Sequence, residues 1–326
     1  MTRPATPTHA RSSESIGDAI RGTVTAIQTN VPSTRPASGP ASCHLCRQTT
    51  HEVVRRAAPF TILRCRNCGL GFLDPQPAPQ ETKELYSEEY FRSHDALAKG
   101  YSGYVTHASD LRATFRQRLR YLPPASGGAR LLDIGAAAGY FVEQARTAGW
   151  DAEGLEPSAW AAAYARDEVK VPVAEGTLET AAIEPGSFDV VTFWEVIEHV
   201  SDPRDFLSRI ARVLKPGGWA LLSTPDAGSL VARMLGNRWL GWQKVPEHLF
   251  YFDRPTLRRL LDETGFDVVG QHYVPLTVTW PYALERLGAS LGLGASAFAG
   301  LSKVLRNRSV SVNCYYDLMV VARARG

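Results

Sequence analysis

The stretch ARLLDIGAAAGYFVEQARTAGW (129–150) sets the fold of this chain. It begins with a short apolar strand, continues through a loop bounded by Gly135 and Gly139, and ends as a helix. A strand, a glycine-bounded loop and a helix in this order form the unit from which parallel, ligand-binding sheets are built. The stretch therefore predicts an α/β fold whose loop meets a ligand at the carboxyl end of a strand.

Further strands and helices alternate along the chain after this unit. DAEGLEP (151–157) is predicted to be a second strand that ends in an acid, and SFDVVTFW (187–194) a third. SDPRDFLSRIARVLKPGG (201–218) has the pattern of a helix with Asp202 as its N-cap, and WALLSTP (219–225) of a further strand. This alternation predicts a doubly wound, mostly parallel sheet with helices on both faces.

The loop 135–139 also indicates which ligand to expect. Ala137 occupies the position where a dinucleotide fingerprint needs a glycine for close approach to a pyrophosphate. S-adenosylmethionine (SAM) has no phosphate, so a slightly bulkier loop is compatible with it. Glu156 ends the next strand, where a carboxylate can accept both hydroxyls of a ribose. The loop and the acid together favour SAM.

A third candidate feature is the run EVIEH (195–199), which directly follows a predicted buried strand. If the run turns as a helix, Glu195, Glu198 and His199 share one face. With His248 from a later loop they would form a partial shell for Mg²⁺ or another divalent ion. Two other interpretations stay open: a metal-free histidine base at His199 or His248, or a purely structural role in holding the loop.

Four motifs resemble those of class I SAM-dependent methyltransferases: LLDIGAAAGYF, GLEPS, FDVVTFWEVIEHVSDP and LKPGGWALLSTP. The resemblance covers about residues 80–326, although Ala136 and Ala137 depart from the family's LDIGCGxG pattern. It implies a Rossmann-like methyltransferase sheet, with an antiparallel end formed by FDVVGQHYV (266–274) and CYYDLMVVA (314–322). It also implies that EGTLET (175–180) flanks the adenine. The implied SAM-binding residues are Asp133, Gly135, Ala137, Gly139, Glu156 and Trp194.

The Glu-x-x-Glu-His run with a distant histidine is similar to the metal site of the small-RNA 3′-terminal 2′-O-methyltransferases. Its first three residues also resemble those of the catechol-methylating enzymes of ubiquinone biosynthesis. In both groups the resemblance implies a divalent metal that holds two adjacent hydroxyls of the acceptor. Glu195, Glu198, His199 and His248 would then be both the metal ligands and the catalytic residues.

Four of the five cysteines form two pairs, Cys43-x2-Cys46 and Cys65-x2-Cys68, with 18 residues between them. Two such turns supply four thiolates in a tetrahedron, which suits a structural Zn²⁺. The segment 41–75 is therefore predicted to be a small zinc-ribbon-like module. Free thiols or a redox pair are the alternatives, and the fifth cysteine, Cys314, is expected to be a core residue.

The remaining segments complete the predicted domain organisation. Residues 1–40 are rich in Ser, Thr, Pro and Ala and are expected to be a disordered tail. Residues 76–125 are expected to be a helical linker or cap, and 126–326 the SAM-binding domain. This domain contains an apolar insertion at 280–305, for which a lid, a homodimer face or a lipid contact are considered. Arg238, Trp239 and Trp242 are expected either to contact substrate or to pack.

The composition limits the partners and the location. The chain is 44% hydrophobic and 21% charged. Its net charge of +3 is small, and no dense stripe of Lys and Arg that would bind nucleic acid is visible. No membrane span or signal-peptide core is visible, so a cytoplasmic protein is expected. The leading hypothesis is O-methylation of a small molecule or glycan with adjacent hydroxyls. The alternatives are a sugar C-methyltransferase, a zinc-ribbon RNA methyltransferase and a non-catalytic SAM sensor.

Overall fold

The computed structural model describes residues 41–77, 91, 105, 107–125, 127–291, 298–305, 308–313 and 316–326. The predicted tail at 1–40 lies outside the described residues, as do Cys314 and most of the predicted linker before residue 105. Within the described ranges, no helix has both the length and the apolar character needed to span a bilayer.

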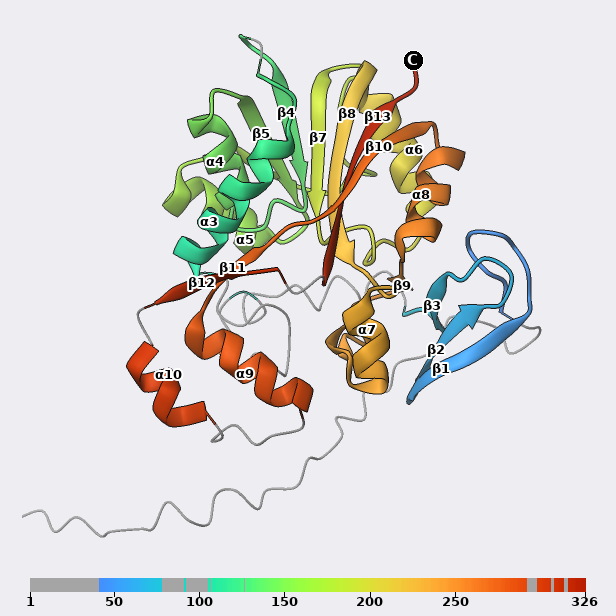
Figure 1. The fold of residues 1–326 in the computed structure, drawn as a ribbon. Helices are drawn as coiled ribbons and strands as arrows, with labels where there is room; N and C mark the ends of the chain where they lie inside the picture. Colours follow the sequence, from blue (N-terminus) through green and yellow to red (C-terminus); the bar gives the residue numbers. More distant parts are fainter. Residues whose placement is uncertain are drawn as a thin grey trace, which may run out of the picture. The chain divides into compact units, whose positions relative to one another are not determined.

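The centre of the fold is a seven-stranded sheet with the order β10-β13-β8-β7-β4-β5-β6 (Figure 1). Its strands are β4 (Arg130–Ile134), β5 (Asp151–Glu156), β6 (Val173–Glu175), β7 (Phe188–Trp194), β8 (Leu214–Pro225), β10 (Phe266–Tyr273) and β13 (Asp317–Ala324). The pairings from β6 to β8 are parallel, whereas β13 is antiparallel to both of its neighbours. The predicted Rossmann-like sheet with an antiparallel end is confirmed.

Helices cover both faces of this sheet. Figure 1 shows α3, α4 and α5 on one side and α6 and α8 on the other. The helices are α3 (Ala108–Arg118), α4 (Tyr140–Thr147), α5 (Ala159–Tyr164), α6 (Pro203–Val213), α7 (Leu230–Leu235), α8 (Arg254–Glu263), α9 (Trp280–Leu291) and α10 (Ala299–Leu305), with the short turns η1 (Leu119–Tyr121), η2 (Ala165–Val169), η3 (Gly236–Arg238) and η4 (Leu240–Gln243). The chain turns from β4 toward β6 and then returns to β7 on the other side of β4. Ligands bind at this kind of switch in strand order.

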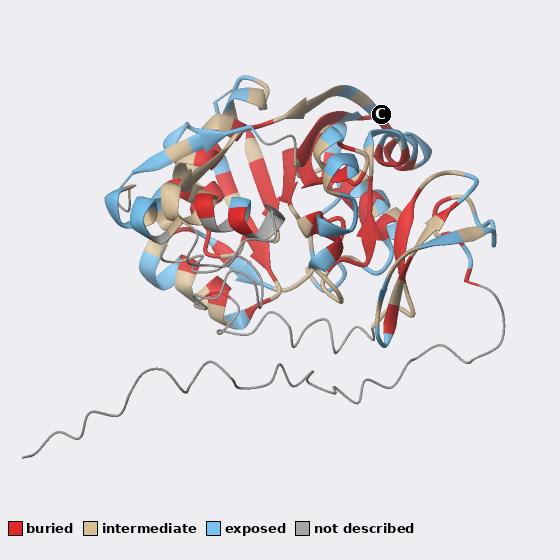
Figure 2. Cartoon of the chain, turned by 60° about the horizontal axis from the view of Figure 1, so that its bottom comes forward, coloured by how far each residue is buried: buried red, intermediate tan, exposed pale blue. Residues whose placement is uncertain are grey.

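Local sequence explains the central elements. The strand β7 is buried along almost its whole length, as expected for the middle of a sheet covered on both faces (Figure 2). Helix α6 begins at Pro203, and the Asp202 carboxylate accepts hydrogen bonds from two backbone N–H groups of its first turn. The buried side chains of α6, Phe206, Ile210 and Val213 among them, follow a helical spacing and pack its apolar face inward.

The cysteine-rich segment folds into a second sheet. Its strands are β1 (His51–Ala57), β2 (Phe60–Cys65) and β3 (Gly71–Asp74), and β1 and β2 form an antiparallel hairpin. A fourth strand, β9 (Phe250–Tyr251), pairs with β3 and comes from the region predicted to be the SAM-binding domain. The module at 41–75 and the later domain therefore share one sheet.

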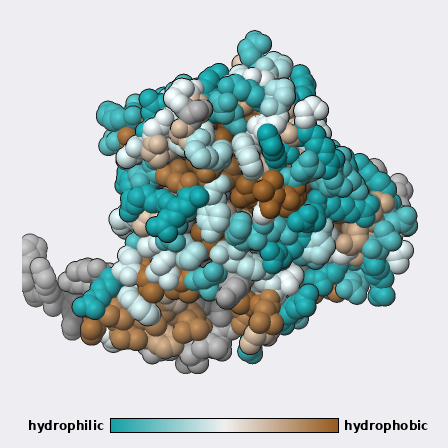
Figure 3. Space-filling model, turned by 45° about the horizontal axis from the view of Figure 1, so that its top comes forward, coloured by the Kyte–Doolittle hydropathy of each residue, from teal (hydrophilic) through white to brown (hydrophobic). Residues whose placement is uncertain are grey.

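The segment between β10 and β13 forms a separate layer below the main sheet in Figure 1. A two-stranded ribbon, β11 (Leu276–Thr279) and β12 (Ser309–Val312), carries α9 and α10 between its strands. The Thr114 hydroxyl accepts the backbone N–H of Thr277, which joins this ribbon to α3. Apolar side chains gather on the surface of this layer (Figure 3), and Leu287, Leu301 and Val304 are exposed.

Candidate active site

A cavity of about 1470 Å³ lies at the carboxyl edge of the central sheet. Its walls come from the segments that follow β4, β5, β6 and β7, from the loop before β9, and from β11 and α9. The run EGTLET (175–180) lines it, as does Trp280 at the start of α9. The insertion at 280–305 therefore contributes one wall of the cavity through α9.

The loop between β4 and α4 has the tight backbone that the sequence predicts. Gly135 and Gly139 both have positive φ, +71° and +77°. A Cβ at Gly135 would lie 2.6 Å from a methyl carbon of Val196, and one at Gly139 would lie 2.6 Å from a methyl carbon of Val171. Glycine is therefore required at both ends for conformation and for space. Ala137 sits between them with φ +48°, and it lines the cavity.

Glu156 is fixed at the end of β5 by this loop. One carboxylate oxygen accepts the backbone N–H of Ala137 at 2.8 Å, and the other accepts that of Ser158 at 2.9 Å. Burial raises the pKa of Glu156 to about 7, against the lowering effect of these two N–H groups. A carboxylate has about four acceptor positions, so acceptor capacity is left for a ligand hydroxyl in the cavity.

Asp133 is the residue before the last in β4, and Trp194 is the last residue of the neighbouring strand β7. Asp133 is buried and accepts a 2.6 Å hydrogen bond from the Thr192 hydroxyl. Burial raises its pKa to about 8, while Thr192 and Arg118 act in the opposite direction. The Trp194 ring lines the cavity, and its Nε1 has no hydrogen-bond partner among the residues that the structure describes.

Arg118 and Asp317 are site residues that the sequence analysis did not identify. Arg118, at the end of α3, lies with its guanidinium 4.9 Å from the centre of the Trp194 ring and 3.7 Å from the Asp317 carboxylate. Both side chains are almost fully buried. A lone acid in the apolar run 314–322 was a usable signal for Asp317, whereas nothing in the local pattern distinguished Arg118 from its neighbouring arginines.

Glu198, His199 and His248 lie close together. Each offers one ligand atom, and these atoms all lie within 4.8 Å of one another. The two imidazole rings are 4.7 Å apart, edge to face, and both histidines line the cavity. Glu198 is buried beside them, and neither of its carboxylate oxygens has a hydrogen-bond partner within the described part of the chain.

The protonation of the two histidines suits a cation. Burial lowers the pKa of His199 to about 4 and that of His248 well below its usual value, so both imidazoles are neutral at neutral pH. His199 Nδ1 lies 2.9 Å from the backbone carbonyl oxygen of Glu247, which assigns the ring proton to Nδ1 and places the lone pair of the neutral ring on Nε2. Burial raises the pKa of Glu198 to about 8, a cost that a bound cation would offset.

Glu195 does not join this group. The prediction assumed that 195–199 turns as one helix, but Glu195 has a positive φ of +54° and only the residues from Val196 to His199 form a turn. The Glu195 carboxylate accepts a 2.6 Å hydrogen bond from the Ser223 hydroxyl on β8. Glu195 still lines the cavity, and burial together with the nearby Asp317 and Glu198 charges raises its pKa well above the usual value.

The two tryptophans expected as lid or packing residues are buried. Trp239 and Trp242 contact each other edge to face with ring centres 4.9 Å apart, and Trp242 also lies 4.9 Å from the Tyr251 ring. Trp239 also lines the cavity, whereas Arg238 is exposed. Packing is therefore the main role of both tryptophans.

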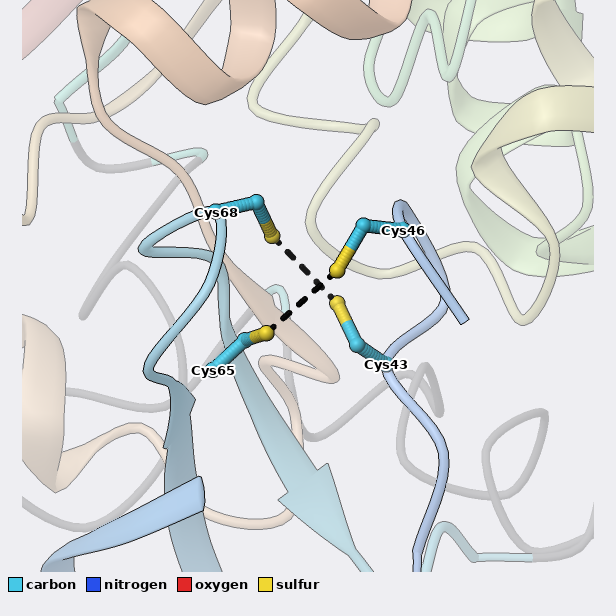
Figure 4. Close-up of side chains that lie close together, drawn as sticks. All are labelled: Cys43, Cys46, Cys65 and Cys68. Carbon is cyan, nitrogen blue, oxygen red and sulfur yellow. Dashed lines mark hydrogen bonds between the residues drawn. The ribbon is translucent and has the colours of Figure 1, made fainter. Parts of the chain in front are cut away.

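The four paired cysteines meet at one point (Figure 4). The sulfurs of Cys43 and Cys68 are 3.5 Å apart, and those of Cys46 and Cys65 are 3.4 Å apart. All four are free thiols. Four sulfurs around a tetrahedral Zn²⁺ are expected about 3.8 Å apart, from a Zn–S distance of about 2.3 Å. The arrangement fits a thiolate-bound ion.

Several known proteins are similar to this chain. A family model described as a methyltransferase domain matches residues 105–271. The ubiquinone biosynthesis O-methyltransferase of Cronobacter sakazakii is 33% identical over 178 residues, which cover 49% of this chain and 73% of the relative. The mitochondrial enzyme of that name from Schizosaccharomyces pombe is 33% identical over 193 residues, which cover 54% and 69%. A solved SAM-dependent methyltransferase from Archaeoglobus fulgidus is 19% identical, with a TM-score of 0.46 over 68% of this chain and 98% of that one.

Proposed function

Because this chain belongs to the methyltransferase domain family and is a SAM-dependent methyltransferase, we propose that it methylates a hydroxyl oxygen of a small acceptor with two adjacent hydroxyls. The observation that carries the proposal is the convergence of Glu198, His199 and His248 at the cavity that the SAM-type loop also lines. The relatives named as O-methyltransferases support transfer to oxygen.

The donor is proposed to bind along the loop after β4. Glu156 would accept the ribose hydroxyls, since its carboxylate is already oriented by the N–H groups of Ala137 and Ser158. The run 175–180 would flank the adenine, and Trp194 would lie beside the donor's reacting end. Four buried carboxyl groups lie at this edge, those of Asp133, Glu156, Glu198 and Asp317, and a positively charged sulfonium would stabilise their ionised forms.

A divalent ion fits the group formed by Glu198, His199 and His248. Its donor set is one carboxylate and two neutral imidazoles, and the carboxylate oxygens are buried without a hydrogen bond from the described residues. When bound, such an ion would lower the pKa of an acceptor hydroxyl and orient its oxygen. The hydrogen bond between His199 and Glu247 would hold the imidazole in the ligating orientation.

Glu195 is proposed to take the proton that the acceptor loses. Methyl transfer forms an O–C bond, breaks the S–C bond of the sulfonium and requires the hydroxyl proton to leave. Glu195 lines the cavity next to the proposed ion but is not among its ligands. Ser223 fixes one of its carboxylate oxygens, and a carboxylate positioned in this way can serve as a general base.

The acceptor is proposed to be an aromatic diol with an apolar substituent. Helix α9 presents Trp280, Leu284 and Leu287 to the cavity, and a glycan would find few polar partners on this wall. The relatives' role in ubiquinone biosynthesis points to the same chemical class. The cysteine cluster is proposed to hold a structural Zn²⁺, with no ligand position open for chemistry.

The test uses the full-length protein, SAM and a catechol that carries an alkyl chain. We expect an O–CH₃ product by NMR, and we expect Mn²⁺ or Mg²⁺ to restore activity after treatment with a chelator. Glu198→Gln and His248→Ala should each lower kcat about tenfold or more through loss of ion binding, while affinity for S-adenosylhomocysteine stays near that of the wild type. Glu168→Gln, an exposed change on η2, is the control.

Three results would redirect the proposal. Full activity in the presence of chelator, combined with loss of activity in His248→Ala, would indicate a metal-free histidine base. A C–CH₃ product would assign the chain to carbon methylation instead. Normal kcat in both Glu198→Gln and His248→Ala would remove this group from the reaction.

A further inference from the structure

Strand β9 begins two residues after His248 and links the proposed ion site to the cysteine-rich module (residues 41–77). On one side, the backbone N–H groups of Leu249 and Phe250 donate to the carbonyl oxygen of Glu198 at 2.8 and 3.2 Å. On the other side, the N–H of Leu73 in β3 donates to the carbonyl oxygen of Leu249 at 2.9 Å. The chain beside His248 is therefore held between Glu198 and the module.

The approach of β3 to β9 is unusually close at one point. Gly71 pairs with Tyr251, and a Cβ at Gly71 would lie 2.9 Å from the Cβ of Tyr251 and 3.3 Å from its carbonyl oxygen. The φ of Gly71 is not in the positive range that favours glycine, so other residues could adopt its backbone conformation. Glycine is therefore needed here for the contact with β9 alone.

Side chains of the module hold both ends of the segment 237–251 that carries His248. Before His248, the Arg55 guanidinium donates to the carbonyl oxygen of Asn237 at 2.9 Å, and Arg64 lies 5.9 Å from the centre of the Trp242 ring. After His248, the His44 ring contacts Phe250 edge to face at 4.9 Å. Three separate contacts thus hold this segment.

The cysteine cluster fixes the part of the module that makes the last of these contacts. His44 lies between Cys43 and Cys46, and its ring also contacts Phe72 on β3 at 5.8 Å. An ion held by the four sulfurs would tie the turn that bears His44 to the end of β2 and the turn before β3. Without such an ion, the turn and the hairpin would be joined by weaker contacts.

We infer that the cysteine-rich module is a positioning device for His248: its ion and its β3 strand together hold β9 and the loop before it in the reactive arrangement. The inference rests on the proposed function for the role of His248 in the reaction. The positioning of the segment around His248 by the module does not depend on that function. Gly71 and the four cysteines are positioning residues in this sense, since none of them lines the cavity. Donor binding, which uses the loop after β4, should be independent of the module.

The experiment compares Gly71→Ala and Cys46→Ser in the full-length protein with Gly127→Ala, a glycine whose added Cβ meets nothing within 4 Å. Hydrogen exchange of residues 246–252 should be at least about tenfold faster in both variants, and Mn²⁺ affinity and kcat should fall about tenfold or more. S-adenosylhomocysteine affinity should change less than about twofold, because its site lies elsewhere. Zinc content should fall only in Cys46→Ser.

The outcomes separate this inference from the proposed function. Gly71→Ala keeps every cysteine, so it tests the module even if Cys46→Ser does not fold. Unchanged hydrogen exchange at 246–252 in Gly71→Ala would overturn the inference. Faster exchange there, without any Mn²⁺ binding in the wild type, would uphold the positioning role and reject the divalent ion at Glu198, His199 and His248.

Discussion

The Nδ1 atom of His199 lies 2.9 Å from the carbonyl oxygen of Glu247, the residue directly before His248. This contact joins two loops that are 48 residues apart in the sequence. It also sets the tautomer of His199, since a ring nitrogen that donates to a carbonyl leaves the other nitrogen as the acceptor. The same contact therefore holds His248 near His199 and fixes the tautomer in which His199 Nε2 can accept.

Glu156→Gln should weaken donor binding strongly. Both carboxylate oxygens of Glu156 accept hydrogen bonds from backbone N–H groups. In glutamine an NH₂ group replaces one of these oxygens, so a side-chain donor would point at a backbone donor. We expect affinity for S-adenosylhomocysteine to fall by about ten- to a hundredfold, equivalent to about 1–3 kcal/mol. Isothermal titration calorimetry measures this directly. Glu153→Gln, on the same strand but paired with Arg130 near the surface, is the matched control and should bind normally.

The stability of the ligand-free protein should fall as pH rises from 6.5 to 8. The pKa of Asp133 is raised from 3.8 to about 8, so the folded protein keeps a proton that the unfolded chain has released. Stability that depends on such a group is present below its unfolded pKa and is lost as pH rises through its folded pKa. The slope is about 1.4 kcal/mol per pH unit for one proton.

Asp133→Asn tests the source of this slope, because the asparagine oxygen can still accept the Thr192 hydroxyl. Glu156, with a pKa raised to about 7, contributes in the same direction and stays in place. The free energy of unfolding in urea, measured at pH 6.5 and 8, should therefore depend less on pH in the variant. An identical pH dependence in both proteins would show that Asp133 is already ionised in the folded state.

Gly135→Ala should destabilise the fold more than Gly149→Ala. Both glycines have positive φ, +71° and +93°, so both substitutions carry a conformational cost of about 1 kcal/mol. The new methyl group at Gly135 would also lie 2.6 Å from Val196, whereas that at Gly149 meets nothing within 4 Å. We expect an additional loss of about 1–3 kcal/mol for Gly135→Ala in urea unfolding. Equal losses would mean that the loop can move away from Val196 without cost.

Arg118→Met should be strongly destabilising, whereas Arg116→Met in the same helix should not. Arg118 is buried beside Asp317 and against the Trp194 ring, so its removal leaves buried carboxyl groups without a cation. The expected loss is about 3–5 kcal/mol in the free energy of unfolding. Arg116 is exposed and bonds Gln144, and its replacement should cost less than about 0.5 kcal/mol. Circular dichroism during urea unfolding compares the two variants.

Much of the site could be predicted because its parts are local. The loop from Gly135 to Gly139 and the acid Glu156 follow adjacent strands, and parallel strands bring their carboxyl ends to one edge. The structure differs at Glu195, because a single positive φ removes it from the turn that holds Glu198 and His199. No helical pattern in the sequence could reveal that φ, since glutamate rarely adopts it.

The sequence by itself determined the core strands of the central sheet, the two glycines of the ligand loop and the grouping of the cysteines into two Cys-x2-Cys pairs. These features depend on neighbouring residues, whose spacing sets backbone conformation and burial. Only the tertiary structure placed Arg118 among the carboxyl groups and joined β9 to β3, because a buried ion pair and a two-residue strand are defined by distant partners. The physical reason is that their energies come from contacts between segments more than a hundred residues apart, which leave no periodic pattern along the chain.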